Sequence, residues 1–205
     1  MKKLYPLLLF GWVLSLAGRD MKNNMAKSLY NLDNKRITRK EYDRAIKDYT
    51  NAIKLDPGYK VAYLARGSAR TWTHDYQGVM LDMNKVLDLD SRCALAYAIR
   101  GFVKGQLGDN PSAFLDLDKA IESDSNCDMA FLYRADLKMK TKDYMGVIND
   151  CSKTIDLNAK SEGAYYMRAN AKSALGLHEQ ACPDWSKAGE LGNMSAYDAM
   201  KKYCN

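Results

Sequence analysis

Residues 60–93 read KVAYLARGSARTWTHDYQGVMLDMNKVLDLDSRC, and residues 94–127 read ALAYAIRGFVKGQLGDNPSAFLDLDKAIESDSNC. Aligned end to end, each stretch has a tyrosine followed four residues later by a glycine, at Tyr63–Gly67 and at Tyr97–Gly101. The same register continues without a gap from Ala26 to Ser195 and gives five units of 34 residues. A fixed period of this length is typical of repeat architectures.

Both halves of each unit have the spacing of an amphipathic helix. The first half carries a large column four residues before a mostly small one: Leu29, Tyr63, Tyr97, Phe131 and Tyr165, then Asp33, Gly67, Gly101, Ala135 and Ala169. The second half carries three columns, spaced by four and three: Ala45, Val79, Ala113, Val147 and Ala181; Tyr49, Met83, Leu117, Cys151 and Trp185; Ala52, Val86, Ala120, Thr154 and Ala188. These spacings place each set on one helical face, so each unit is predicted to be two antiparallel helices.

Polar residues separate the two halves: Glu41–Tyr42, Asp75–Tyr76, Asp109–Asn110 and Asp143–Tyr144. They are suited to capping the second helix. The small column lets the two helices of a unit approach closely. Leucine at Gly67 or Gly101 is therefore expected to force them apart, at a cost of about 1–3 kcal/mol or more.

On these columns the chain resembles a tetratricopeptide repeat (TPR) array of the exported bacterial type. The resemblance implies an all-α fold, a right-handed α-solenoid of about five stacked helix-turn-helix units plus a C-terminal capping helix. The expected organisation is a signal peptide (1–17), a short segment (18–25), the five units of 26–195 (26–59, 60–93, 94–127, 128–161 and 162–195) and the capping helix (196–205). The chain departs from the TPR pattern at Asp33, in the small column, and where the proline of Asp56–Pro57–Gly58 is replaced by Ser91, Ser125 and Ala159.

The N-terminus has the pattern of a secretory signal peptide. Lys2 and Lys3 precede an apolar run from Leu4 to Leu16, and Ser15–Leu16–Ala17 ends it with small residues, so cleavage is expected after Ala17. The alternative is an uncleaved anchor, but the run is shorter than the roughly 20 residues that span a bilayer. We expect no stable membrane span in the mature chain. Cleavage removes two lysines and lowers the net charge of +6 to +4, which gives only a weak electrostatic basis for binding nucleic acid.

A second pair of columns carries opposite charges. The first halves hold Arg66, Arg100, Arg134 and Arg168, and the second halves hold Asp82, Asp116, Asp150 and Asp184. We predict structural ion pairs within each unit: Arg66–Asp82, Arg100–Asp116, Arg134–Asp150 and Arg168–Asp184. The alternative pairs each aspartate with the arginine of the next unit. A charge pattern copied at the repeat period indicates a building element, and such pairs define packing more than they stabilise it.

The five cysteines divide into three sets. Cys93 and Cys127 share one column of adjacent units, about 8–10 Å or more apart, which is too far for a disulfide. Cys151 lies in a core column. Cys182 and Cys204 lie symmetrically about Asn193, so a last helix that folds back would bring them level as a candidate disulfide; the alternative is two buried thiols.

No catalytic, metal or cofactor site is expected. His74 and His178 lie in different units without ligand spacing, and the sequence has no glycine-rich phosphate loop and no Gly-x-Ser-x-Gly elbow. Nothing supplies a nucleophile with an adjacent base.

A partner is expected on the concave face that first helices line in such solenoids. Two columns point away from the packed face: Tyr30, Leu64, Ala98, Leu132 and Tyr166; Asn34, Ser68, Phe102, Asp136 and Asn170. Related arrays that clamp a terminal carboxylate use lysine, arginine and asparagine here, whereas these positions are mainly apolar, small or neutral. An extended or helical peptide fits better. The alternative is that the aromatic residues only pack between units.

The sequence therefore predicts an exported, non-catalytic scaffold that binds a protein or peptide without cofactor. An alternative is a module for a non-protein ligand such as an acidic polymer. Nucleic-acid binding is a weaker third class, because export argues against it.

Overall fold

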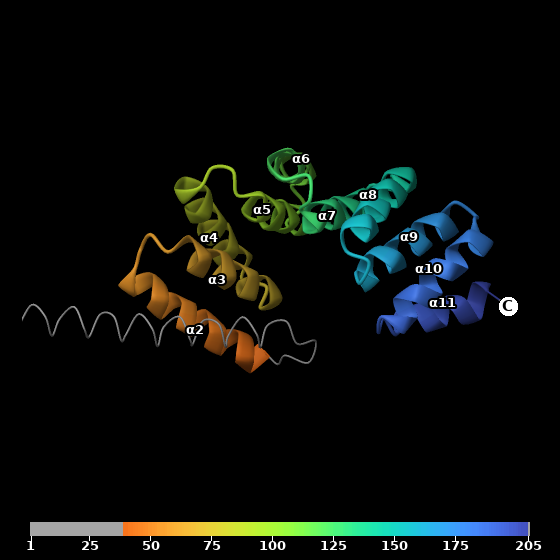
Figure 1. The fold of residues 1–205 in the computed structure, drawn as a ribbon, viewed down its shortest axis with the longest axis horizontal. Helices are drawn as coiled ribbons and strands as arrows, with labels where there is room; N and C mark the ends of the chain where they lie inside the picture. Colours follow the sequence, from red (N-terminus) through yellow and green to blue (C-terminus); the bar gives the residue numbers. More distant parts are fainter. Residues whose placement is uncertain (1–38, 205) are drawn as a thin grey trace, which may run out of the picture. The chain divides into compact units, whose positions relative to one another are not determined.

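The structure is a computed structural model that describes residues 39–204. Its described part is built from helices joined by short turns (Figure 1). Their bounds are α2 (Arg39–Leu55), α3 (Lys60–Trp72), α4 (Tyr76–Leu89), α5 (Ala94–Gln106), α6 (Asn110–Ser123), α7 (Asp128–Lys140), α8 (Tyr144–Leu157), α9 (Glu162–Ala174), α10 (His178–Glu190) and α11 (Ser195–Tyr203). The predicted all-α helical-repeat class is confirmed. The predicted signal peptide (1–17), the segment 18–25 and the first helix of the first unit lie outside the described residues.

The chain divides into two compact units, Met1–Asp90 and Ser91–Asn205, which we call the N-terminal and C-terminal units. In the N-terminal unit α3 packs against both α2 and α4. In the C-terminal unit each first helix packs against the second helix of its own repeat, in the pairs α5–α6, α7–α8 and α9–α10. The first helices α5 and α7 also contact each other, as do α7 and α9, and α11 packs on α10.

The three columns of the second helices form the core, as predicted. All fifteen positions are buried, and the middle column of Tyr49, Met83, Leu117, Cys151 and Trp185 is at most 1% exposed. Facing them on the first helices, Gly67, Gly101, Ala135 and Ala169 are also buried. The small residues of the first helix let the two helices of a repeat pack closely. The larger side chains of the middle column fill the space that remains between them.

The second helices begin at capping aspartates. Asp75, Asp109 and Asp143 each accept a hydrogen bond from the backbone N–H three residues on, which satisfies a free donor of the first turn. The cap expected at Glu41 is wrong, because α2 already begins at Arg39 and Glu41 lies in its first turn.

The turns between repeats share a side-chain hydrogen bond, both where proline follows, at Asp56–Pro57, and where it is missing. Asp56, Asp124 and Asn158 occupy the same position in three repeats, and each side chain accepts a hydrogen bond from the backbone N–H two residues on, at 2.9, 2.9 and 3.1 Å. This side-chain turn supplies locally what proline supplies through its fixed φ.

The turns inside the repeats require a left-handed residue at one position. Gly108 and Gly176 occupy it with φ of 87° and 79°, whereas His74 and Lys142 adopt 60° and 62°. A side chain in this region costs about 1–2 kcal/mol. Lys142→Gly is therefore expected to raise the free energy of unfolding by about 1 kcal/mol, and the reverse change Gly108→Lys to lower it by a similar amount, measured by urea denaturation. A Lys142→Gly variant less stable than the wild type would contradict this account.

Candidate functional site: charged clusters and the first-helix face

A buried aspartate lies at the centre of each charged cluster. Asp82, Asp116, Asp150 and Asp184 project from α4, α6, α8 and α10 with side chains only 2–8% exposed. The arginine of the same repeat donates two hydrogen bonds to each carboxylate: Arg66 at 3.0 and 2.6 Å, Arg100 at 2.7 and 2.8 Å, Arg134 at 2.9 and 2.7 Å, and Arg168 at 2.9 and 2.6 Å. The predicted pairing within each repeat is confirmed.

Each aspartate also binds a second cation, which the sequence analysis missed. One helical turn after the arginine stand Arg70, Lys104, Lys138 and Lys172, whose nitrogens lie 2.9, 2.7, 2.8 and 2.7 Å from the same carboxylates. These residues recur at the repeat period, so the signal was present in the sequence. Each cluster thus joins two cations of a first helix to one carboxylate of the second helix.

The arginines also reach the preceding repeat. A further nitrogen of Arg66 donates to Thr50 at 3.1 Å, that of Arg134 to Asp118 at 2.7 Å and that of Arg168 to Ser152 at 3.0 Å. The three acceptors share one position of the preceding second helix. The alternative pairing with the next repeat is therefore wrong for the buried aspartates, although each of these arginines does bridge two repeats through a different residue.

The large column of the first helices lies beneath the guanidinium groups. Arg66, Arg100, Arg134 and Arg168 stand 5.4–5.7 Å from the ring centres of the aromatic residues three positions earlier. This is within the range of cation–π attraction. With side chains only 13–21% exposed, the arginines are held by a ring and by carboxylates, and the clusters are structural elements.

Charge pairing controls the titration of Asp116. Burial alone would raise the pKa of this carboxyl, but hydrogen bonds from Arg100 and Lys104 outweigh it and hold the pKa below its usual value. A lowered pKa in the folded state stabilises the fold above the unfolded pKa of about 4, and this contribution is lost as the pH falls through the folded pKa.

The charge of Asp116 makes its contribution to stability depend on pH. The stability difference between the wild type and Asp116→Asn is expected to be largest near pH 7 and to shrink progressively below about pH 4. At low pH the Asp116 carboxyl is protonated, so the wild type, like the variant, has no charge at this position. Urea denaturation of both proteins between about pH 2.5 and 7 measures this. A difference that is constant over that range would exclude the ion pairs as its source.

The predicted partner-binding residues occupy different environments. Tyr30 and Asn34 lie outside the described residues. Ala98 is fully buried in α5, so the prediction that it contacts a partner is wrong. Leu64, Ser68, Phe102, Leu132, Asp136, Tyr166 and Asn170 are partly exposed, the first two in the N-terminal unit and the others in the C-terminal unit.

In the C-terminal unit the structure joins some of these residues across adjacent first helices. Phe102 of α5 packs on Tyr133 of α7, with ring centres 4.6 Å apart. Asp136 of α7 pairs with Lys140 at 3.2 Å and accepts a hydrogen bond from Gln106 of α5 at 3.5 Å. We call the partly exposed residues Phe102, Leu132, Asp136, Tyr166 and Asn170 the first-helix face.

Two members of the first-helix face are tied to the core at the end of the array. The side-chain oxygen of Asn170 accepts a hydrogen bond from the Trp185 indole at 2.9 Å, and Tyr166 packs against the cluster around Trp185. Leu132 likewise packs on the core cluster of α7, α8 and α9. The face therefore combines apolar side chains held in place by the core with neutral amide and paired charged groups.

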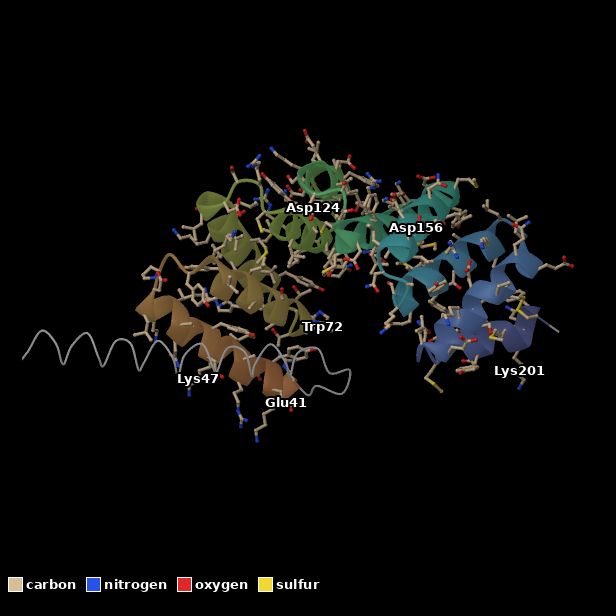
Figure 2. All side chains as sticks on the ribbon, in the orientation of Figure 1. Glu41, Lys47, Trp72, Asp124, Asp156 and Lys201 are labelled. Carbon is tan, nitrogen blue, oxygen red and sulfur yellow. A yellow bond between two sulfur atoms is a disulfide. The ribbon has the colours of Figure 1, made fainter. Side chains whose placement is uncertain are left out.

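The N-terminal unit has an exposed tryptophan, stacked on a partly buried tyrosine, that the sequence did not indicate. Trp72, labelled in Figure 2 at the end of α3, is 69% exposed, and its ring stacks on Tyr42 of α2 with centres 6.0 Å apart.

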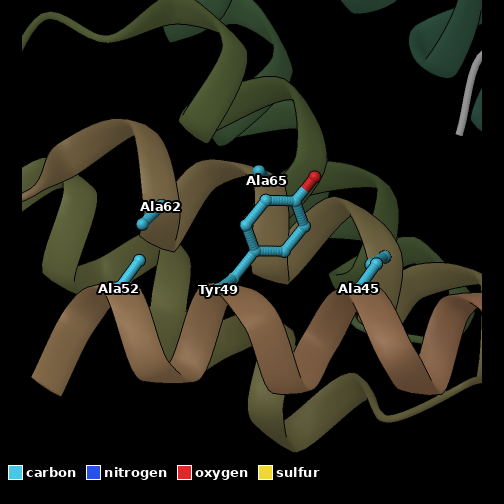
Figure 3. Close-up of a cluster of buried hydrophobic side chains, with 6 residues drawn as sticks. Ala45, Tyr49, Ala52, Ala62 and Ala65 are labelled. Carbon is cyan, nitrogen blue, oxygen red and sulfur yellow. The ribbon is translucent and has the colours of Figure 1, made fainter. Parts of the chain in front are cut away.

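Tyr49 carries a buried hydroxyl with no hydrogen-bond partner among the described residues. Its ring extends from α2 towards α3, among Ala45, Ala52 and Ala65 (Figure 3). Burial and the charge of Asp48 raise the pKa of this phenol well above its usual value. Trp185, in the same column, has its partner in Asn170; the position equivalent to Asn170 in the first repeat is Asn34, outside the described residues.

A phenylalanine at position 49 is expected to be tolerated. Tyr49→Phe removes a buried donor without changing the shape of the core. The thermal midpoint should therefore stay the same or rise, and the free energy of unfolding should increase by up to about 1–2 kcal/mol. Thermal unfolding followed by circular dichroism tests this. A loss of more than about 1 kcal/mol would mean that the hydroxyl has a bonding partner.

Cys182 of α10 and Cys204 after α11 form a disulfide with Cα atoms 5.8 Å apart, which confirms that pairing. Cys93, Cys127 and Cys151 have free thiols, as expected for the first two. Burial raises the pKa of the Cys151 thiol to about 12.

In residues 39–204 no three histidine, cysteine or acidic side chains gather in a way that could hold a metal ion. Nor does this part of the chain contain a helix that is both long and apolar enough to cross a bilayer.

Comparisons with known proteins identify the fold. No protein-family model matches the sequence, and curated protein sequences give no match. Three solved structures illustrate the similarity, and this chain spans most of each of them. TTC0263, a thermophilic TPR protein of Thermus thermophilus, is 14% identical with a TM-score of 0.72, and the match covers 90% of this chain and 97% of TTC0263.

Two further structures concern peptide binding. YrrB, described as a TPR protein with an unusual peptide-binding site, is 20% identical with a TM-score of 0.56 over 79% of this chain and 84% of its own. The first TPR of Spaghetti (RPAP3), solved with the HSP90 peptide SRMEEVD, is 26% identical with a TM-score of 0.53 over 56% of this chain and 93% of its own. Together with the 34-residue register and the paired helices, these matches show that the chain has the tetratricopeptide repeat fold.

Proposed function

We propose that the protein is a non-catalytic scaffold that binds a peptide or protein segment on the first-helix face of its C-terminal unit. The observation that carries the proposal is the Phe102–Tyr133 pair, which places a partly exposed aromatic surface across α5 and α7. Leu132 and Tyr166 extend the apolar character to α7 and α9. Partly buried aromatic anchors beside polar groups are the usual source of affinity in peptide recognition. Peptide binding by YrrB and by the RPAP3 domain supports this function.

The first-helix face favours an apolar peptide segment. Its described residues offer no set of free cations that would bind the terminal carboxylate of a peptide. The neighbouring cation, Lys140, is already paired with Asp136, and the oxygen of Asn170 is engaged by Trp185. Leu132 and Tyr166 stand where a carboxylate clamp needs cationic side chains. The acidic peptide SRMEEVD is therefore expected not to bind, and it serves as a negative control.

Export is part of the proposal. A disulfide between Cys182 and Cys204 is supported by an oxidising compartment, and the N-terminal pattern ending at Ala17 would direct the chain there. N-terminal sequencing of the protein recovered from its host tests this. A mature chain that begins at Gly18 supports export, whereas an intact Met1 in the cytoplasmic fraction contradicts it.

Charge introduction tests the binding face. Phe102→Glu places a charge on the aromatic surface, and Leu115→Glu is the matched control, since Leu115 is 71% exposed on the second helix α6. The expected result is that a protein captured by cross-linking to the wild type is lost with Phe102→Glu and kept with Leu115→Glu, while circular dichroism shows both variants folded.

Two outcomes would contradict this function. Equal capture by both variants would exclude the first-helix face. Salt-sensitive retention on a polyanion without any captured protein would instead support a non-protein ligand, although residues 39–205 carry almost equal numbers of basic and acidic side chains.

A further inference from the structure

The C-terminal helix is fixed at one end by a covalent bond. The disulfide joins Cys182, in the first turns of α10, to Cys204, directly after α11, and closes a loop with a sequence separation of 22. Without it, α11 is held by Ala196, Ala199 and Met200 in the cluster around Trp185, and by Tyr203, whose ring stacks on His178 at 4.7 Å and on Trp185 at 5.7 Å.

These contacts alone hold α11 weakly. The helix has nine residues, fewer than the roughly 12–15 at which an isolated helix becomes marginal in water. Ala196 and Ala199 bury little apolar area, and Tyr197, whose ring covers Gly189 of α10, remains 50% exposed. Tyr203, its largest aromatic contact, remains 38% exposed. The docking of α11 therefore depends strongly on the covalent link.

A reductant can reach the disulfide. Cys182 and Cys204 are both partly exposed, so the bond is not sealed inside the core. Cys151, by contrast, is completely buried, and burial raises the pKa of its thiol to about 12, so it does not react readily. Cys93 and Cys127 are partly exposed free thiols, but they lie in other repeats, so reduction in the C-terminal repeat acts on the bond that secures α11.

We propose that the Cys182–Cys204 disulfide is a redox-controlled lock on the C-terminal helix. A dithiol reductant transfers two electrons and two protons to the bond; the S–S bond breaks, two cysteine thiols form, and the reductant is oxidised to its own disulfide. Once the disulfide is reduced, α11 detaches from α10 and uncovers Trp185. The side chain of Trp185 is 1% exposed while the bond is intact. The core of α5–α8 keeps its structure in both states, because the packing partner of α11 is α10.

Hydrogen exchange of the full chain, with and without dithiothreitol, tests the lock. Loop closure over 22 residues predicts amide exchange in 195–203 on the order of 100-fold faster after reduction, with exchange in α5–α8 unchanged. The Cys182→Ser/Cys204→Ser variant should exchange fast under both conditions. The Cys93→Ser/Cys127→Ser variant, which lacks two free thiols, should respond to reductant as the wild type does.

Equal protection of 195–203 in the oxidised and reduced wild type would overturn the proposal, since the wild-type comparison needs no variant to fold. So would a Cys182→Ser/Cys204→Ser variant that is as well protected as the oxidised wild type. Faster exchange throughout α5–α10 after reduction would also overturn the proposal. It would show that the disulfide stabilises the whole C-terminal unit and does not act locally on α11.

Discussion

Replacing Asp150 by alanine is expected to lower the free energy of unfolding by about 3–5 kcal/mol, because it leaves two largely buried cations without their buried counter-charge. The Asp150 side chain is 5% exposed and binds Arg134 at 2.7 Å and Lys138 at 2.8 Å. In the variant, Arg134 retains the exposed Asp118, but Lys138, 19% exposed, loses the carboxylate beside it. Urea denaturation followed by circular dichroism measures the loss.

Asp156→Ala is the matched control for Asp150→Ala. Asp156 lies in the same helix α8, but its side chain is exposed (Figure 2). Loss of an exposed carboxylate changes stability by less than about 1 kcal/mol. If the two variants were equally stable, the buried clusters would contribute nothing beyond surface charge, and their description as structural elements would be wrong.

The repeat period predicted the core because each column marks the same helical position in every repeat. Tyr49, Met83, Leu117, Cys151 and Trp185 differ in chemistry but share a spacing, and all are buried. The pairing of Arg134 with Asp150 was predictable for the same reason. The period also allowed a pairing with the arginine of the next repeat, and the structure shows the pairing within one repeat.

The second cation was missed because lysine is ordinarily assigned to the surface. Lys104, Lys138 and Lys172 stand one turn after an arginine, and residues four apart lie on one face of a helix, so both cations of a first helix reach the same carboxylate. Periodicity identifies the lysine column in the sequence. Only the structure shows that the second helix is close enough for these lysines to reach its aspartates.

The binding face was less predictable, since it depends on how neighbouring helices cover one another. Ala98 and Phe102 lie four residues apart on α5, yet Ala98 is fully buried and Phe102 is not. A first helix in a stacked array contacts helices on more than one side, so only part of its outward side stays accessible. Asn170 shows the same effect, because its amide faces Trp185.

Gly101→Ala is expected to destabilise the C-terminal unit by about 1–3 kcal/mol, the range for overpacking a close-packed core. A Cβ at this position would stand 2.8 Å from Cγ of Leu117 and 3.1 Å from the carbonyl oxygen of Ala113. Leu117 is completely buried, and the Ala113 oxygen belongs to the backbone of α6, so neither can move aside easily. Relief of the clash requires α5 and α6 to separate.

The same substitution at Gly163 should have the opposite sign. Gly163 lies in the first turn of α9, and a Cβ there meets nothing within 4 Å. Alanine restricts the unfolded chain and favours the helix, so a gain of up to about 1 kcal/mol is expected. Thermal unfolding of Gly101→Ala, Gly163→Ala and the wild type compares one added methyl group in two helices. A loss of stability in both variants would mean that glycine is needed for its backbone freedom, whereas a loss only at Gly101 assigns the effect to the close approach of the two helices of a repeat.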